Sequence, residues 1–315
     1  MDNKLVSNRS RRADYEVLNK IYYHTLRNFF RDIQDMNYAI IKGEALSLVA
    51  YGGTGYRLCT DVDLLILKKD LYRFDSLLKK YGFKQYSENG NREARRSDRL
   101  FSVLNSHQDL PYILKIPSLK INIAVDLNFD LFWGGYEGNK IDIEQFLKDS
   151  KKEIIHGNEV KILTVEKSII QVCLHHYKDM NSLYILATKG YISANQLEDI
   201  FNLVNRYGES FTADRLYEVC VKYKVVKYVY YVLYHTAKLY SSIYFDNIID
   251  FFASRNQNLE NTFNTYGLRK EEYKSWWIPF EERISNDNVS QYITSQLTDS
   301  EVKGIKKNNL YFNSI

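Results

Sequence analysis

Two aspartates, Asp61 and Asp63, stand two residues apart where a strongly apolar segment, residues 62–67, begins. Apart from Asp63 this short segment is entirely apolar, which predicts a strand that is buried on both faces. Side chains two positions apart on a strand point to the same side, about 6.5–7 Å from each other. Two carboxylates placed in this way repel each other and are costly to bury, and a divalent cation resolves both problems. The pair therefore predicts a metal site for Mg²⁺ or Mn²⁺.

A third carboxylate, Asp126, lies at the end of another predicted strand, residues 121–127, in which apolar and polar residues alternate. If this strand neighbours the strand of Asp63, Asp126 lies about 5 Å away from it laterally. Three carboxylates can hold two ions about 3.5–4 Å apart. An acidic pair alone is a weak signal, so the prediction depends on this third acid. We interpret Asp126 as a metal ligand or as a general base.

Residues that could bind phosphate precede the acidic pair. Lys42 and Gly43 stand between a predicted strand, residues 38–41, and a predicted helix, residues 44–49. A glycine lets the backbone approach a phosphate, and the free N–H groups at the start of a helix can bind it. Arg57 follows a glycine-rich turn and could clamp a triphosphate. The alternatives are an ordinary strand-to-helix turn and a surface arginine.

The remaining pattern predicts an α+β fold in two domains. The first, residues 1–135, combines a mixed sheet with helices, and the second, residues 136–315, is mostly helical. Further strands are predicted near residues 83–86, 100–104, 112–116 and 160–163, with a basic loop at 92–99. Helices are predicted at residues 13–36, 71–81, 141–155, 165–177, 195–207, 213–222 and 225–240.

Length and composition narrow the class of protein. The 315 residues suit two domains, and the net charge of +4 is compatible with a nucleotide ligand but is lower than a dedicated DNA-binding protein usually carries. The three cysteines are widely spaced and predict neither a disulfide framework nor a zinc site. Residues 1–12 are polar and lead into no apolar signal region, and no apolar run is long enough to span a membrane. We expect a cytoplasmic protein with no membrane partner.

The motifs together resemble a known family. The segment Ile41-Lys42-Gly43-Glu44-Ala45-Leu46, then Arg57, then Asp61-Val62-Asp63-Leu64-Leu65, looks like the uncharacterised bacterial nucleotidyltransferase family of the DNA polymerase beta superfamily. The segment Val125-Asp126-Leu127-Asn128-Phe129 looks like the strand of that family that carries the third carboxylate. The resemblance covers roughly residues 18–240 and is strongest over residues 40–67.

This resemblance implies a polymerase-beta-like N-terminal domain and a magnesium-dependent enzyme. The enzyme would transfer a nucleoside monophosphate from an NTP, such as ATP, to a hydroxyl or phosphate of an acceptor and release pyrophosphate. By the same resemblance, the metal ligands would be Asp61, Asp63 and Asp126, and the residues facing the nucleotide would be Lys42, Gly43 and Arg57. The helical domain would lie on the acceptor side of the cleft. The acceptor stays open between a small molecule, a peptide, a protein and tRNA.

Two departures from the family pattern keep other functions open. Glu44 stands where the wider superfamily usually has a serine that binds phosphate, and Asn128 stands where the family often has histidine. Both would also suit a non-catalytic, nucleotidyltransferase-like binding protein. A glycosyltransferase that binds its metal through Asp61 and Asp63 is another alternative, but it would require several α/β units before the motif. The basic loop, residues 92–99, could bind an anionic acceptor such as RNA, or it could simply be solvated.

Overall fold

The computed structural model describes residues 2–87, 92–132, 140–189, 194–208, 212–256, 259, 263–268, 272–285 and 289–312. The chain forms two compact units. Unit 1 comprises Met1–Asp130 and Asp142–Ser168, and unit 2 comprises Leu131–Ile141 and Ile169–Ile315. Across the described residues, every helix is too short or too polar to cross a membrane.

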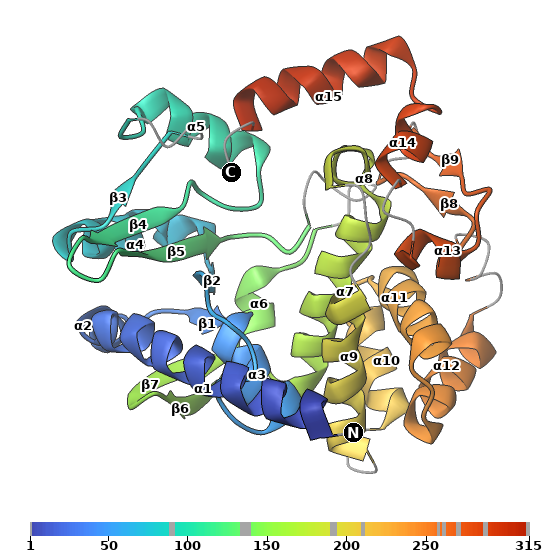
Figure 1. Ribbon diagram of the computed structural model, residues 1–315, viewed down its shortest axis with the longest axis horizontal. Helices are drawn as coiled ribbons and strands as arrows, with labels where there is room; N and C mark the ends of the chain where they lie inside the picture. Colours follow the sequence, from blue (N-terminus) through green and yellow to red (C-terminus); the bar gives the residue numbers. More distant parts are fainter. Residues whose placement is uncertain are drawn as a thin grey trace. The chain divides into compact units, whose positions relative to one another are not determined.

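Unit 1 is built on a mixed sheet of seven strands in the order β3-β4-β5-β2-β1-β7-β6 (Figure 1). The pairs β2–β5 and β1–β7 are parallel, and the other neighbouring pairs are antiparallel. All five residues of β2 are buried, Asp63 among them, as the apolar character of the other four predicts. The strands are β1 (Tyr38–Ile40), β2 (Val62–Ile66), β3 (Lys84–Gln85), β4 (Tyr112–Ile116), β5 (Ile121–Asn128), β6 (Lys151–Ile155) and β7 (Asn158–Ile162).

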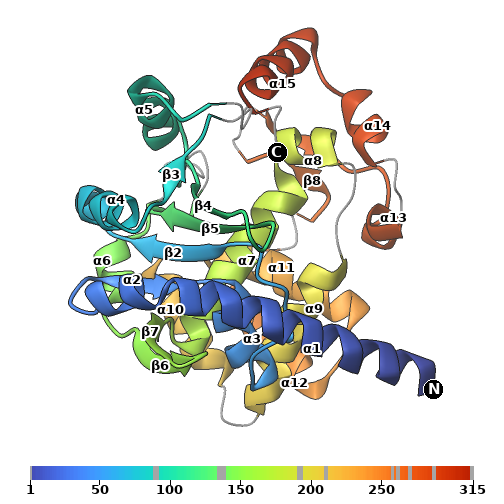
Figure 2. The same ribbon diagram turned by 60° about the vertical axis from the view of Figure 1, so that its left-hand side comes forward.

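Helices pack onto this sheet and carry part of the candidate site. The first predicted helix, residues 13–36, is observed as two helices, α1 and α2, that meet at Leu26. Figures 1 and 2 both show α1 running alongside α3, the helix that follows β1. The helices of unit 1 are α1 (Asp2–Thr25), α2 (Arg27–Asp32), α3 (Gly43–Tyr51), the 3₁₀ turn η1 (Lys68–Asp70), α4 (Leu71–Lys80), α5 (Arg96–Asn105) and α6 (Ile143–Leu147).

Unit 2 is mostly helical, which confirms the predicted α+β arrangement of a sheet-containing half followed by a helical half. Helices α9 to α12 pack on one another, and a short hairpin of β8 (Thr265–Tyr266) and β9 (Lys274–Ser275) follows them. The helix α7 begins in unit 1 and continues into unit 2. The helices are α7 (Val165–Asn181), α8 (Leu183–Lys189), α9 (Ala194–Tyr207), α10 (Ala213–Lys222), α11 (Val226–Leu239), α12 (Ile243–Arg255), α13 (Phe280–Ser285), α14 (Val289–Thr294) and α15 (Asp299–Phe312).

The predicted strand at residues 100–104 is wrong, because this segment lies inside helix α5. Its apolar side chains Leu100 and Leu104 are four residues apart, a spacing that suits a helix as well as a strand over so short a window. The first turn of the helix favours the helical conformation. There the Asp98 carboxylate accepts a hydrogen bond of 2.8 Å from the Arg95 backbone N–H. An acidic side chain that returns to the N-cap in this way stabilises a helix start.

The predicted helix at residues 141–155 is also wrong in its second part. Only Ile143–Leu147 is helical, and Lys151–Ile155 forms strand β6, which pairs with β7 through a tight hairpin. The turn residues His156 and Gly157 both have positive φ, 46° and 76°, as such a two-residue hairpin requires. Strands β6 and β7 lie beyond the expected boundary between residues 135 and 136, yet they complete the N-terminal sheet next to β1.

Candidate active site

The three predicted acids come together on the sheet of unit 1. Asp61 immediately precedes β2, and Asp63 is the second residue of that strand. Strands β2 and β5 pair in parallel, with Asp63 directly opposite Asp126. Because adjacent strands lie about 4.8 Å apart, one ion can be reached by a carboxylate from each strand. The strands of Asp63 and Asp126 are thus neighbours in the sheet. The prediction that Asp126 lies beside Asp63 required this pairing.

The carboxylate of Asp63 is held by two donors. The residue is 3% exposed, and its Oδ1 atom accepts hydrogen bonds from Lys42 Nζ at 3.0 Å and from Asn128 Nδ2 at 3.2 Å. Lys42 precedes α3, and its neighbour Ile41 donates its backbone N–H to the carbonyl oxygen of Asp63 at 3.1 Å. The antiparallel pairing of β1 with β2 therefore positions the predicted phosphate-binding lysine against the acidic group.

The three carboxyl groups of Asp61, Asp63 and Asp126 lie close together, and the single positive charge of Lys42 is not enough to neutralise them all. Burial raises the pKa of Asp126 to about 8, and the charges of Asp63 and Asp61 add to this effect. Burial and then the charge of Asp63 raise the pKa of Asp61, while Lys42 and Arg57 partly offset the rise. Burial alone would lower the pKa of Lys42, but the charge and hydrogen bond of Asp63 raise it. A site with this imbalance suits a divalent cation.

Gly43 and Arg57 lie beside this group of acids. Gly43 has a φ of +54°, and a Cβ atom added there would lie 2.6 Å from Cys59 Sγ, so only glycine fits. Arg57 lies in segment 53–60, the loop between α3 and β2, close enough to Asp61 for its charge to act on that carboxyl group. The structure gives Gly43 a packing role in addition to the close phosphate approach that the sequence suggests.

The two departures from the family pattern have structural explanations. Glu44 is fully buried, and its carboxylate accepts hydrogen bonds from the backbone N–H of Gly55 at 3.1 and 3.0 Å. The carboxylate of Glu44 is therefore directed to segment 53–60 and bound there by the Gly55 backbone. Asn128 is 2% exposed and donates to Asp63, so it orients one of the acids.

Sequence reasoning missed two residues of α1 that attach this helix to the site. The Tyr22 hydroxyl donates to the carbonyl oxygens of Asn122 at 2.6 Å and Thr60 at 3.2 Å. Asn19 is fully buried and contacts segment 53–60. A signal for Asn19 was present, because it falls on the same helical stripe as the buried Tyr23, four residues further on. A polar residue on an apolar stripe points to a specific partner.

Two of the four arginines in the basic segment 92–99 form ion pairs within unit 1. Arg92 pairs with Asp98 at 2.7 Å, and Arg99 pairs with Asp75 and Asp109 at 3.0 Å each. Residues 96–99 belong to α5 and not to a loop. These ion pairs leave less free positive charge for an anionic acceptor than the sequence suggests.

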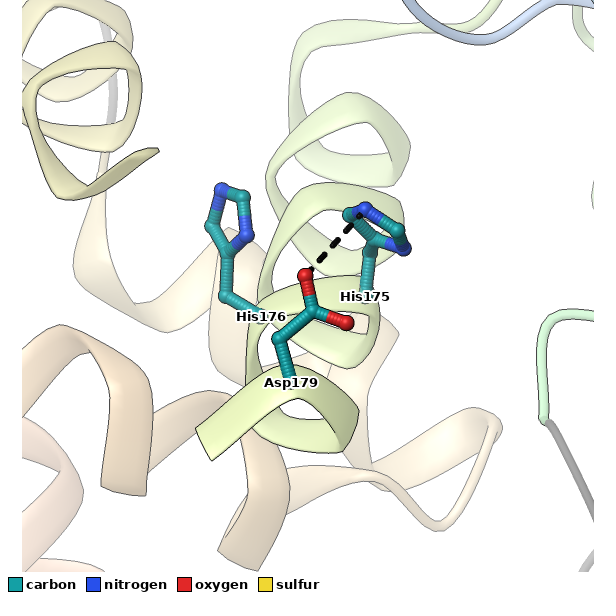
Figure 3. Close-up of side chains that lie close together, drawn as sticks. All are labelled: His175, His176 and Asp179. Atoms are coloured by element: carbon teal, nitrogen blue, oxygen red, sulfur yellow. Dashed lines mark ion pairs between the residues drawn. The ribbon is translucent and has the colours of Figure 1, made fainter. Parts of the chain in front are cut away.

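A second cluster of potential metal ligands lies in unit 2, where single ligand atoms of His175, His176 and Asp179 are all within 4.8 Å of one another. Figure 3 shows the Asp179 carboxylate beside both rings, with an ion pair of 3.6 Å from His175 Nε2 to Asp179 Oδ2. Lys178 Nζ lies 3.3 Å from the other ring nitrogen of His175 and 3.6 Å from Asp179 Oδ1. The lysine ammonium already supplies the positive charge here, so we interpret the cluster as structural.

Comparison with known proteins identifies the class. A family model described as "Uncharacterised nucleotidyltransferase" matches residues 4–241. The chain therefore belongs to this nucleotidyltransferase family, which confirms the resemblance seen in its motifs. No curated protein matches the sequence.

Two solved structures are similar in part. One is an antigenic nucleotidyltransferase-like protein from Paracoccidioides brasiliensis, with 17% identity over 66% of this chain and 91% of that one, at a TM-score of 0.36. The other is the antibiotic-resistance factor ANT(2'')-Ia, with 12% identity over 71% of this chain and 100% of that one, at a TM-score of 0.37.

Proposed function

We propose that this protein is a polymerase-beta-type enzyme that transfers a nucleoside monophosphate from an NTP to a hydroxyl or phosphate of an acceptor, with Mg²⁺ or Mn²⁺, and releases pyrophosphate. The observation that carries the proposal is the register of β2 and β5, which pairs Asp63 with Asp126 beside Asp61 and Lys42. The family supports an NTP as the donor.

The residues fit a divalent metal ion. Three carboxylates converge, and Asp126 Oδ1 is buried without a hydrogen-bond partner among the described residues. A buried acceptor atom with no donor is costly unless a ligand satisfies it. We assign Asp61, Asp63 and Asp126 as the residues that would hold the metal. A bound ion of this kind neutralises phosphate charge and lowers the pKa of an attacking hydroxyl.

The side chains have separate roles in the proposed reaction. Lys42, whose ammonium contacts Asp63, is placed to donate to a phosphate oxygen, and Arg57 adds a second positive charge from segment 53–60. The first N–H groups of α3, the helix that Lys42 precedes, would add further donors. Asp126 would hold the metal or accept the proton of the acceptor hydroxyl.

The alternatives have less support. A glycosyltransferase has less support because the family model that matches residues 4–241 is that of a nucleotidyltransferase. A non-catalytic binding protein was motivated by Glu44 and Asn128, and both side chains have hydrogen-bonding roles that leave the three acids intact.

Nucleotide binding tests the proposal without knowledge of the acceptor. With Mg²⁺ present, at least one of the four NTPs, added at about 100 times its own dissociation constant, should raise the melting temperature by on the order of 5–10 °C. Lys42→Met should weaken this binding by about 10–100-fold, because a charge-assisted hydrogen bond contributes about 1.5–3 kcal/mol. Stabilisation by UDP-sugars but by no NTP would favour the glycosyltransferase instead.

A further inference from the structure

Glu44 is a fully buried acid in the first turn of α3, next to the proposed phosphate-binding residues. A carboxylate in such a place needs several donors to offset the loss of water. Its oxygens accept from the backbone N–H of Gly55 and from Asn19 Nδ2, and Oε1 lies 3.0 Å from His156 Nε2. Glu44 therefore joins α3, α1, the β6–β7 hairpin and segment 53–60 at one point.

Asn19 extends the same network along segment 53–60. Its Nδ2 atom also donates to the carbonyl oxygen of Arg57 at 2.7 Å, and its Oδ1 atom accepts from the backbone N–H of Cys59 at 2.9 Å. Two buried side chains, Glu44 and Asn19, thus satisfy backbone groups at three positions, residues 55, 57 and 59. Alternate residues of the loop are fixed in this way immediately before Asp61.

An outer layer of contacts supports this network. Glu16, on α1, accepts from Thr54 Oγ1 at 3.1 and 3.2 Å, and its Oε1 atom lies 3.8 Å from His156 Nδ1. Gly55 has a φ of +80°, and a Cβ atom there would lie 2.4 Å from Glu16 Oε2. The close approach of α1 to the loop therefore depends on a glycine at position 55.

We propose that Glu44 and Asn19 are positioning residues that hold segment 53–60 so that Arg57 faces the triphosphate and Asp61 stays beside Asp63. The inference rests on the proposed function for the role of Arg57. Glu44 stands where the wider superfamily usually has a phosphate-binding serine. The inference gives Glu44 a different role, which is to hold segment 53–60, the loop that carries Arg57. Hydrogen-bonding partners behind a ligand-binding group commonly contribute about 10–100-fold to affinity or activity.

The test compares Glu44→Gln with Asp75→Asn as a matched control. Asp75 is also a buried acid, 6% exposed, and it pairs with Lys79, Arg99 and Tyr112, outside segment 53–60. In Glu44→Gln the new amide group opposes existing donors, so hydrogen exchange in segment 53–60 should be at least about tenfold faster, and NTP–Mg²⁺ affinity about tenfold weaker. Asp75→Asn should change neither quantity by more than about twofold, even where it lowers the melting temperature.

Asn19→Ala should cause the same two changes, and it decides the question if Glu44→Gln does not fold. Unchanged exchange in segment 53–60 in these variants would overturn the inference. Faster exchange with unchanged NTP affinity would also overturn it, because the network would then be structural only. If the wild type binds no NTP, the proposed function fails separately, and the exchange rates still decide whether Glu44 and Asn19 hold the segment.

Discussion

Replacing Asp63 with asparagine should lower the rate of nucleotidyl transfer by at least about 10³-fold. The substitution keeps the shape of the side chain but removes the negative charge at the centre of the site, where Asp63 lies opposite Asp126 and accepts from Lys42 and Asn128. A charge that holds a metal and the phosphates opposite it contributes several kcal/mol to the transition state. The measurement is transfer of label from each α-labelled NTP, with Mg²⁺, to components of a cell extract.

Asp75→Asn is the control for this experiment, because it removes a similarly buried acid from a different network in unit 1. It should label the same acceptor as the wild type at a similar rate. If Asp63→Asn labels everything that the wild type labels, the acids do not form the catalytic site.

Replacing Asp126 with asparagine should raise the stability of the protein at pH 8 and lower its transfer activity. Burial and the neighbouring acids raise the pKa of Asp126 from 3.8 to about 8, so the folded protein binds this proton more tightly than the unfolded chain does. The resulting stability is fully present below about pH 4 and is lost as the pH rises towards 8. Asparagine avoids this loss, so Asp126→Asn should melt on the order of 5 °C above the wild type at pH 8.

Thermal melts of the two metal-free proteins between pH 4 and pH 8, in the presence of a chelator, measure this effect. The difference should be small near pH 4 and should grow as the pH rises. Transfer activity should fall strongly in the same variant, since it removes a proposed ligand or base. A wild type that is the more stable protein at pH 8 would show that the charge of Asp126 is compensated in the fold.

The central strands could be predicted from sequence because their patterns are strong and local. The apolar residues around Asp63 in β2 and the alternation in β5 specify buried strands, and the parallel register of these two strands aligns Asp63 with Asp126. The failures have equally local causes. Leu100 and Leu104 fit a strand or a helix until the capping contact of Asp98 in the first turn of α5 is recognised, and β6 depends on the turn at His156.

The network around Glu44 could not be predicted in the same way, because its partners are distant in sequence. Asn19 lies 25 residues before Glu44, and His156 lies 112 residues after it. The position of Glu44 in the sequence indicates only that it lies near the proposed phosphate site. The direction of its side chain depends on how α1 and the β6–β7 hairpin pack against α3. A buried polar residue on an apolar helical stripe, such as Asn19, is the signal to seek for such contacts.

A crystal soaked with Mn²⁺ and a non-hydrolysable NTP analogue tests the central claim most directly, because manganese is located by its anomalous scattering. The account predicts manganese bound by Asp61, Asp63 and Asp126, with the triphosphate contacting Lys42 and Arg57. Nucleotide bound elsewhere, with no manganese between these three carboxylates, would contradict it.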